Sequence, residues 1–310
     1  MDARLSLNLA TLTALAYTLA AAALFTVVFA SAKIVGTNAD PIQVVFMRYA
    51  GAAIVISAIA LTVNRGLAGL RSPVPGLHAA RAISGVGGEV CIISAPLFMA
   101  LEDASAINLT GGVFALFLAV FVLKEATRAA HWIAALICLS GAFLIARYQV
   151  VDNDNATTLF GVAIALAGAV LGGTELFFIK LLTRHDRPLV IMLYVNVLAV
   201  FLLIIPALWV WKPLDQNDAG FLLMLGPMAL LAQFCLIRAF ALADAVIIVP
   251  MTYIAIPMAA VFGYFAFGQE LGSAQIIGAL LVISGGVLLA RLPVRQALPP
   301  AETVSSKTEG

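Results

Sequence analysis

Ten apolar segments, arranged in two successive series of five, restrict what this chain can fold into. Each segment holds about 18 to 25 residues, enough for a helix to cross the roughly 30 Å hydrocarbon core of a bilayer. Because lipid offers the backbone no hydrogen bonds, these segments are expected to be helices. An odd number of crossings in each series turns the second series upside down. The sequence therefore predicts an all-α integral membrane protein with ten transmembrane helices in two inverted five-helix repeats.

Short polar stretches between the apolar segments set the expected boundaries. The first repeat is expected over residues 8–147 and the second over 159–291, and residues 292–310 are expected to form a disordered cytoplasmic tail. The expected helices lie near 8–32, 42–63, 79–100, 105–123, 131–147, 159–182, 189–211, 219–240, 246–268 and 274–291.

The repeat is visible in the residues themselves. Ala135–Arg147 and Ala279–Arg291 are identical at seven of thirteen positions, where an Ala- and Leu-rich background would give about two or three. Further matches follow in the same order along both halves: Lys33 and Pro41 with Lys180 and Pro188, Glu89 with Gln233, Asp103-Ala104 with Asp244-Ala245, and Glu125 with Glu270.

The composition excludes a water-soluble domain. Hydrophobic residues make up 63% of the 310 residues and charged residues only 11%, whereas soluble domains carry about 25% charged residues. A net charge of +1 offers no basic surface for nucleic acid, which is excluded as a partner. The three cysteines and three histidines show neither a C-x-x-C pair nor the spacing of metal ligands. We expect no metal, no cofactor and no catalytic residues.

Positive charge predicts the orientation. With both termini in the cytoplasm, the inner segments hold 13 Lys and Arg residues and the outer segments hold 3. Cytoplasmic connections of membrane proteins carry such an excess of positive charge. The chain is therefore expected to be a multi-pass protein of the bacterial cell inner membrane with both termini in the cytoplasm.

Paired motifs at equivalent places in the two halves give the chain a family likeness. They are Ala100-Leu101 with Ala104, Ala241-Leu242 with Asp244-Ala245, Lys124-Glu125, Gln269-Glu270, Ser140-Gly141 and Ser284-Gly285, joined by Phe46-Met47-Arg48-Tyr49 in the second span. From about residue 14 to 291 the chain resembles the drug/metabolite transporter superfamily, specifically its ten-helix EamA branch. In one departure, the fourth span is about one turn shorter than the ninth and has no counterpart of Pro257. The resemblance implies transport of small organic metabolites: amino acids and their derivatives, nucleobases, or vitamins such as riboflavin.

Glu89 is the first candidate for a substrate-binding or proton-coupling residue. It lies near the middle of the third span, where an ionised side chain costs about 2.5–3.5 kcal/mol on insertion scales and must face a cavity or a partner. One interpretation makes it a substrate anchor or proton carrier; the other makes it a structural carboxylate paired with Arg48 or Arg81. Its repeat counterpart Gln233 would suit a polar, uncharged ligand, or form an ordinary hydrogen bond between helices.

Further candidates are weaker. Glu175 lies in a glycine-rich stretch and could bind a ligand or form a pair with Lys180 at the cytoplasmic end. Arg48 could bind a carboxylate, although a structural role is favoured. The remaining polar side chains at cavity depth are Asn108, Tyr194, Asn196 and Tyr253, each of which could equally be a packing residue.

Other classes of membrane protein fit less well. An intramembrane enzyme would need His, Asp, Ser or Arg side chains clustered at one depth, and a channel would need polar rows or a filter. A secondary transporter with a small-molecule substrate, and not an enzyme, is expected. Few fixed charges and several aromatic residues favour uptake of riboflavin or a similar heteroaromatic vitamin; export of amino acids or nucleobases is the alternative. A homodimer and a monomer both fit the sequence.

Overall fold

A computed structural model describes residues 9–35, 39–63, 70–95, 98, 107–108, 110–125, 128–147, 156–255, 257–258, 261–262, 265 and 273–291. All regular elements among these residues are helices. Those of the first repeat are α1 (Leu9–Val35), α2 (Pro41–Val63), α3 (Pro75–Ser94), α5 (Thr110–Phe121) and α6 (Ala129–Arg147). Those of the second are α7 (Ala156–Leu182), α8 (Pro188–Trp209), α9 (Gln216–Leu242), α10 (Ala245–Thr252) and α12 (Ser273–Ala290). The expected tail over 292–310 lies outside the described residues.

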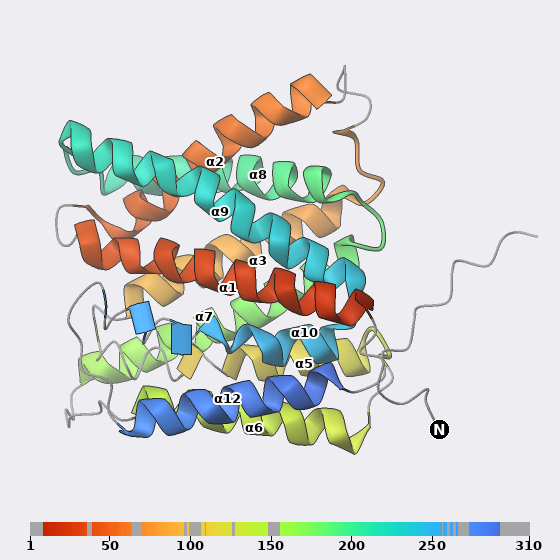
Figure 1. The fold of residues 1–310 in the computed structure, drawn as a ribbon. Coiled ribbons are helices and arrows are strands. Elements are labelled where there is room, and N and C mark those ends of the chain that lie inside the picture. The colour runs from red at the N-terminus through yellow and green to blue at the C-terminus, as the bar shows by residue number, and fades with distance from the viewer. Residues whose placement is uncertain are drawn as a thin grey trace, which may run out of the picture.

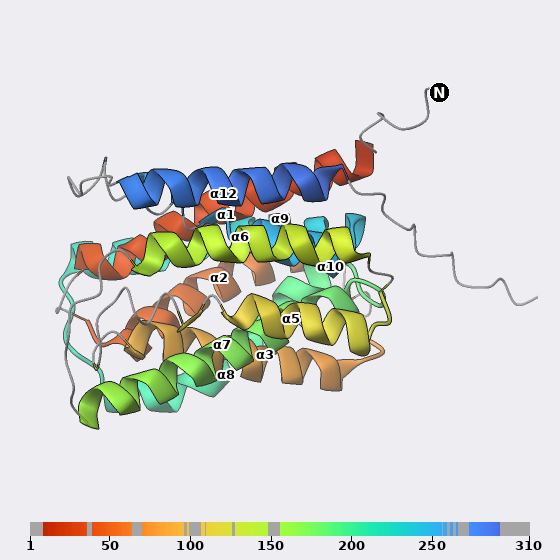
Figure 2. The ribbon, with the colours of Figure 1, turned by 90° about the horizontal axis from the view of Figure 1, so that it is seen from below.

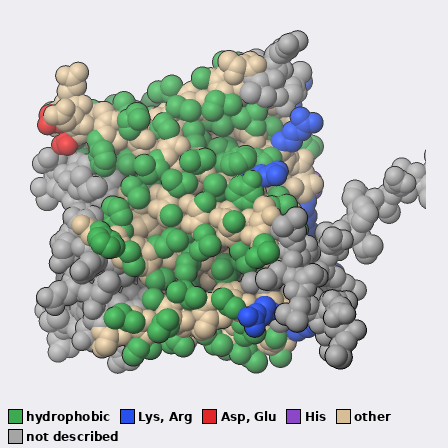
Figure 3. Space-filling model, viewed as in Figure 1, with side chains coloured by type: hydrophobic (Ala, Val, Ile, Leu, Met, Phe, Trp, Pro, Cys, Tyr) green, Lys and Arg blue, Asp and Glu red, His purple; other side chains and the backbone are tan. Residues whose placement is uncertain are grey.

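Five of the described helices, α1, α2, α7, α8 and α9, are long and apolar enough to cross a membrane, and α5, α6 and α12 contain shorter apolar stretches. The helices lie side by side along a common direction (Figure 1). Their surface is apolar: hydrophobic side chains cover the visible face, while Lys and Arg gather at one end of the bundle (Figure 3). Such a surface is suited to lipid.

The packing of the helices confirms the inverted repeat. The first helices of the two halves, α1 and α7, run in opposite directions (Figure 1). Helix α3 packs on α7, and its counterpart α9 packs on α1; α2 packs on α8, and α6 on α12. The last pair runs side by side in both views (Figures 1 and 2). The α3–α7 and α9–α1 contacts are equivalent to each other, and the α2–α8 and α6–α12 contacts each join two equivalent helices. A two-fold relation between the halves requires this pattern.

Local sequence explains where several helices begin. Helices α2, α3 and α8 begin at Pro41, Pro75 and Pro188, and proline suits the first helical position because the amide hydrogen it lacks has no partner there. Helix α9 begins after Asp215, whose carboxylate accepts a hydrogen bond of 2.7 Å from the amide of Asp218, a standard N-terminal cap.

The prediction of one continuous helix over 246–268 is wrong. Helix α10 ends at Thr252, and Tyr253 and Ile254 form a turn. Pro257 accounts for the break because it has no amide hydrogen to donate to the carbonyl four residues earlier, at Tyr253, and its ring crowds that carbonyl. The third helix also differs from its prediction at 79–100, since α3 begins at Pro75 and ends at Ser94.

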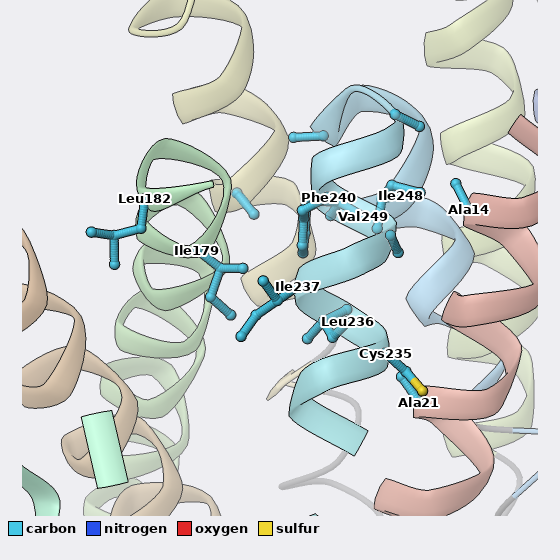
Figure 4. Close-up of a cluster of buried hydrophobic side chains, with 14 of the residues drawn as sticks. Ala14, Ala21, Ile179, Leu182, Cys235, Leu236, Ile237, Phe240, Ile248 and Val249 are labelled. Atoms are coloured by element: carbon cyan, nitrogen blue, oxygen red, sulfur yellow. The ribbon is translucent and has the colours of Figure 1, made fainter. Parts of the chain in front are cut away.

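A buried apolar cluster holds the two repeats together (Figure 4). Ile179 of α7 and Ile237 and Phe240 of α9 lie in it with Ile248 of α10, and each is at most 2% exposed. Helix α1 contributes small residues such as Ala14, which let helices approach closely and pack by van der Waals contact in a membrane. This cluster fixes α7 and α9, two of the helices that carry polar residues at the site.

Candidate functional site

The first polar contact inside the bundle joins Arg48 of α2 to Glu89 of α3. The guanidinium Nη2 donates to Glu89 Oε2 in an ion pair whose side chains are 5% and 12% exposed. The guanidinium carbon of Arg48 also lies 4.1 Å from the ring centre of Tyr49, a favourable cation–π distance. The structure therefore brings together two residues singled out from the sequence, in the pairing expected for a structural carboxylate, and Arg48 points inward rather than to the membrane surface.

A second ion pair joins Arg81, which like Glu89 is on α3, to Glu175 of α7. Nη2 of Arg81 is 3.7 Å from Glu175 Oε1, and the side chains are 1% and 27% exposed. Nη1 of Arg81 donates a hydrogen bond of 3.0 Å to the backbone carbonyl of Ile191 in α8. A Cβ atom on Gly85 would lie only 2.8 Å from the Glu175 carboxyl carbon. Glycine at this position therefore gives the Glu175 carboxylate room to lie against α3.

The two pairs form one charged cluster, defined here as Arg48, Glu89, Arg81 and Glu175. Glu175 interacts electrostatically with Arg81, Glu89 and Arg48. The cluster draws on α2 and α3 of the first repeat and α7 of the second, and its formal charges sum to zero. Since a lone charge at this depth is costly, mutual pairing is what lets four ionisable side chains occupy an apolar bundle.

A neutral, hydrogen-bonded pair joins α8 and α9, the counterparts of α2 and α3 in the second repeat. Nδ2 of Asn196 in α8 donates to Oε1 of Gln233 in α9 at 3.0 Å and to the backbone carbonyl of Met192 at 2.8 Å. Both amide side chains are buried, at 0% and 7% exposure. Oδ1 of Asn196 has no hydrogen-bond partner among the described residues.

The other predicted site residues lie apart from these pairs. Tyr194 stacks on His78, with ring centres 4.3 Å apart, and His78 Nε2 lies 2.9 Å from Asp186 Oδ2. Tyr253 packs in a separate apolar cluster that contains residues of α1, α6, α10 and α12. Asn108 is half-buried just before α5. Neither the Tyr194–His78 stack nor the apolar cluster around Tyr253 contains a residue of the charged cluster.

Lys180 does not pair with Glu175, which corrects that expectation. Its ammonium donates to the carbonyls of Phe240 and Ala243 at 2.9 and 2.7 Å, and it lies 3.7 Å from Asp244 and 4.0 Å from Glu125. Cationic groups suit the C-terminus of a helix, here α9, because unpaired carbonyls point there.

Glu125, between α5 and α6, completes this contact between the repeats. Its carboxylate accepts hydrogen bonds from the amides of Ala245 and Val246 at 3.2 and 3.1 Å, at the positive N-terminal end of α10. Burial raises the pKa of the Glu125 carboxyl, opposed by Lys180 and by these two amides. The matches of Lys33 with Lys180 and of Glu125 with Glu270 were the sequence signal that could have identified these residues.

Comparison with known proteins decides the family. The model of the EamA-like transporter family matches this chain twice, over residues 12–147 and 159–291. The chain belongs to this family. The EamA-like transporters form part of the drug/metabolite transporter superfamily, in agreement with the resemblance seen in the sequence motifs. A protein of known crystal structure has the same fold, with a TM-score of 0.74 at 18% identity over 90% of this chain and 94% of the other.

Several curated EamA relatives are transporters of different compounds. The pseudopaline exporter CntI of Pseudomonas aeruginosa is 26% identical over 270 residues, 86% of this chain and 92% of the relative. A riboflavin transporter of Brucella anthropi is 25% identical over 263 residues, 82% and 89% of the two chains. The S-adenosylmethionine uptake transporter of Rickettsia prowazekii is 22% identical over 252 residues, 81% and 83%. The protein is accordingly a multi-pass inner-membrane transporter of small metabolites.

Proposed function

We propose that this EamA-like protein transports a small zwitterion of the amino-acid type. The observation that carries the proposal is the charged cluster, in which two arginines and two glutamates are paired within the bundle. A zwitterion can exchange with such a pair without leaving a charge uncompensated, because its carboxylate replaces a glutamate and its ammonium replaces an arginine. A substrate with one net charge would leave the low-dielectric interior unbalanced, at a cost of several kcal/mol.

One of the named relatives transports a compound that contains an amino-acid group. S-adenosylmethionine, the compound in the name of the Rickettsia uptake transporter, carries the α-ammonium and α-carboxylate groups of an amino acid, together with a sulfonium charge that gives it a net charge of +1. The sequence predicted few fixed charges and therefore riboflavin; the structure adds Arg81 and pairs both arginines with glutamates. These contacts favour the amino-acid class among the expected alternatives.

The test is counterflow in proteoliposomes preloaded with unlabelled compound, a format that responds to transport in either direction. Labelled methionine, leucine, phenylalanine, S-adenosylmethionine and riboflavin are compared with empty liposomes. We expect at least one of the three amino acids to accumulate, and its decarboxylated amine to compete poorly. Accumulation of riboflavin alone, or of S-adenosylmethionine alone, would contradict the proposal.

Riboflavin uptake is the second candidate, favoured by the neutral pair of Asn196 and Gln233 and by the riboflavin transporter among the relatives. Two amides can donate to and accept from the polar edge of a flavin ring. A bacterium unable to make riboflavin should then grow on low external riboflavin when it expresses this protein. Lack of growth and of uptake from a protein present in the membrane would exclude this candidate.

We further propose that both termini lie in the cytoplasm. The distribution of 13 inner and 3 outer Lys and Arg residues supports this orientation. Lys and Arg side chains gather at the end of the bundle where α1 begins and α12 ends (Figures 1 and 3). C-terminal reporter fusions, one active only inside the cell and one only outside, test it; activity of the outer reporter would reverse the orientation.

A further inference from the structure

We infer that Arg81 binds the carboxylate of the transported zwitterion and that Glu175 binds its ammonium group, an assignment that rests on the function proposed above. The sequence motifs did not mark Arg81 as a site residue. Its place in the structure does so, because it is a fully buried arginine whose contacts are incomplete.

The unpaired atoms of Arg81 lie on a single edge of its guanidinium. Nη1 is taken by the carbonyl of Ile191, whereas Nε and Nη2 have no hydrogen-bond partner among the described residues. Nε and Nη2 are the two nitrogens that donate side by side, in the fork that matches both oxygens of one carboxylate. A buried donor without a partner costs about 1–3 kcal/mol. The edge is therefore suited to a two-oxygen acceptor such as a carboxylate.

Glu175 lies in front of this edge without occupying it. Its nearer oxygen is 3.7 Å from Nη2, beyond the range of a direct hydrogen bond. Its side chain is 27% exposed, against 12% for Glu89. The Arg48–Glu89 pair, in contrast, is a direct hydrogen-bonded contact. Of the two pairs on α3, the one with Arg81 is the more open to a ligand.

The surroundings of this pair suit a ligand that both repeats must recognise. Arg81 is on α3, Glu175 on α7 and the Ile191 carbonyl on α8, so the first repeat supplies one partner and the second supplies two. Glycines line the α3–α7 contact: a Cβ atom on Gly88 would lie 3.1 Å from the Gly172 amide nitrogen. A carboxylate on Arg81 leaves Glu175 free to accept hydrogen bonds from an ammonium group, which keeps the local charge balanced.

The experiment separates the two ends of the ligand. Three unlabelled compounds compete with labelled methionine in counterflow: methionine, methioninamide, which lacks the carboxylate, and N-acetylmethionine, which lacks the ammonium. The corresponding leucine and phenylalanine compounds are tested in parallel. Arg81→Gln should weaken competition by the amino acid about tenfold to hundredfold, the range for a charge-assisted pair, and leave that by the amide nearly unchanged. Glu175→Gln should weaken competition by the amino acid and by the amide, but not competition by the N-acetyl compound.

Arg81→Lys distinguishes an effect on binding from a loss of folding. It keeps a positive charge beside Glu175 but removes the paired Nε and Nη2 donors. We expect it to be as thermostable in detergent as wild type, yet to show less stabilisation by methionine. Arg238→Lys on α9 is the matched control and should change neither competition nor stabilisation. If wild type transports amino acids and Arg81→Gln keeps the same preference for the carboxylate, this inference fails alone. If wild type transports none of the three amino acids, the proposed function fails and the inference fails with it.

Discussion

The two repeats share a backbone arrangement but differ in the chemistry of equivalent contacts. In the first repeat α2 and α3 are joined by the ion pair of Arg48 and Glu89; in the second, α8 and α9 are joined by the amides of Asn196 and Gln233. Aligning Pro41 with Pro188 places Tyr49, next to Arg48, opposite Asn196, and Glu89 aligns with Gln233. The contact between these equivalent helices is thus charged in one half and neutral in the other. It uses the same position on α3 and α9 and positions one residue apart on α2 and α8.

The second ion pair sharpens the contrast. In the same alignments the position of Arg81 holds Leu225 in α9, and that of Glu175 holds Val28 in α1; both apolar side chains are buried, at 3% and 4% exposure. The helices of the two repeats thus pack in the same way. The ion pairs lie at the α2–α3 and α3–α7 contacts and not at the equivalent α8–α9 and α9–α1 positions. A ligand bound between the halves would therefore meet charge on the α3 and α7 side and amides on the α8 and α9 side.

The largest expected effect comes from breaking the charged contact. Glu89→Leu leaves Arg48 buried without its anion and should lower the free energy of unfolding by about 3–5 kcal/mol. The double variant Arg48→Leu/Glu89→Leu should recover most of that stability but not transport. Chemical unfolding in detergent and counterflow measure the two. A double variant as unstable as Glu89→Leu would show that the cost comes from packing and not from an unpaired charge.

A smaller effect follows from exchanging the small residues beside the pairs. Gly85 aligns with Ala229 in the other half, and Gly85→Ala would place a methyl group 2.8 Å from the Glu175 carboxyl carbon. The flexible carboxylate should move, so transport falls severalfold while stability changes by less than about 1 kcal/mol. Ala229→Gly is the control: it should cost about 1 kcal/mol in the helix yet leave transport intact. Normal transport by Gly85→Ala would mean that Glu175 needs no fixed position.

The smallest effect belongs to the neutral contact. Gln233→Leu removes one hydrogen bond to Asn196, whose Nδ2 keeps its bond to the Met192 carbonyl. Hydrogen bonds between membrane helices average about 0.6 kcal/mol, so stability should fall by roughly that amount. Amino-acid counterflow should change little, whereas riboflavin transport, if present, should weaken. A stability loss as large as that of Glu89→Leu would refute the contrast between the halves.

The sequence alone determined the class, the repeat and most of the polar residues that matter. Hydrophobic runs long enough to span a bilayer must be helices, because lipid leaves the backbone no other partner. Glu89, Arg48, Glu175, Asn196 and Gln233 were noticeable because polar side chains are rare and costly at such depths. The continuous ninth helix was wrongly predicted because hydrophobicity does not register the backbone break near Pro257.

Only the tertiary structure decided which of these residues meet. Glu175 and Lys180 are close in sequence, but five residues turn a helix by about 140°, so the two side chains leave α7 in different directions. Glu175 instead meets Arg81 of α3, and Lys180 meets the end of α9 and Glu125. These contacts join residues 55 to 94 positions apart, and they depend on how inverted helices pack against each other. Single-residue patterns carry no record of that packing, which is why Arg81 was recognised only in the fold.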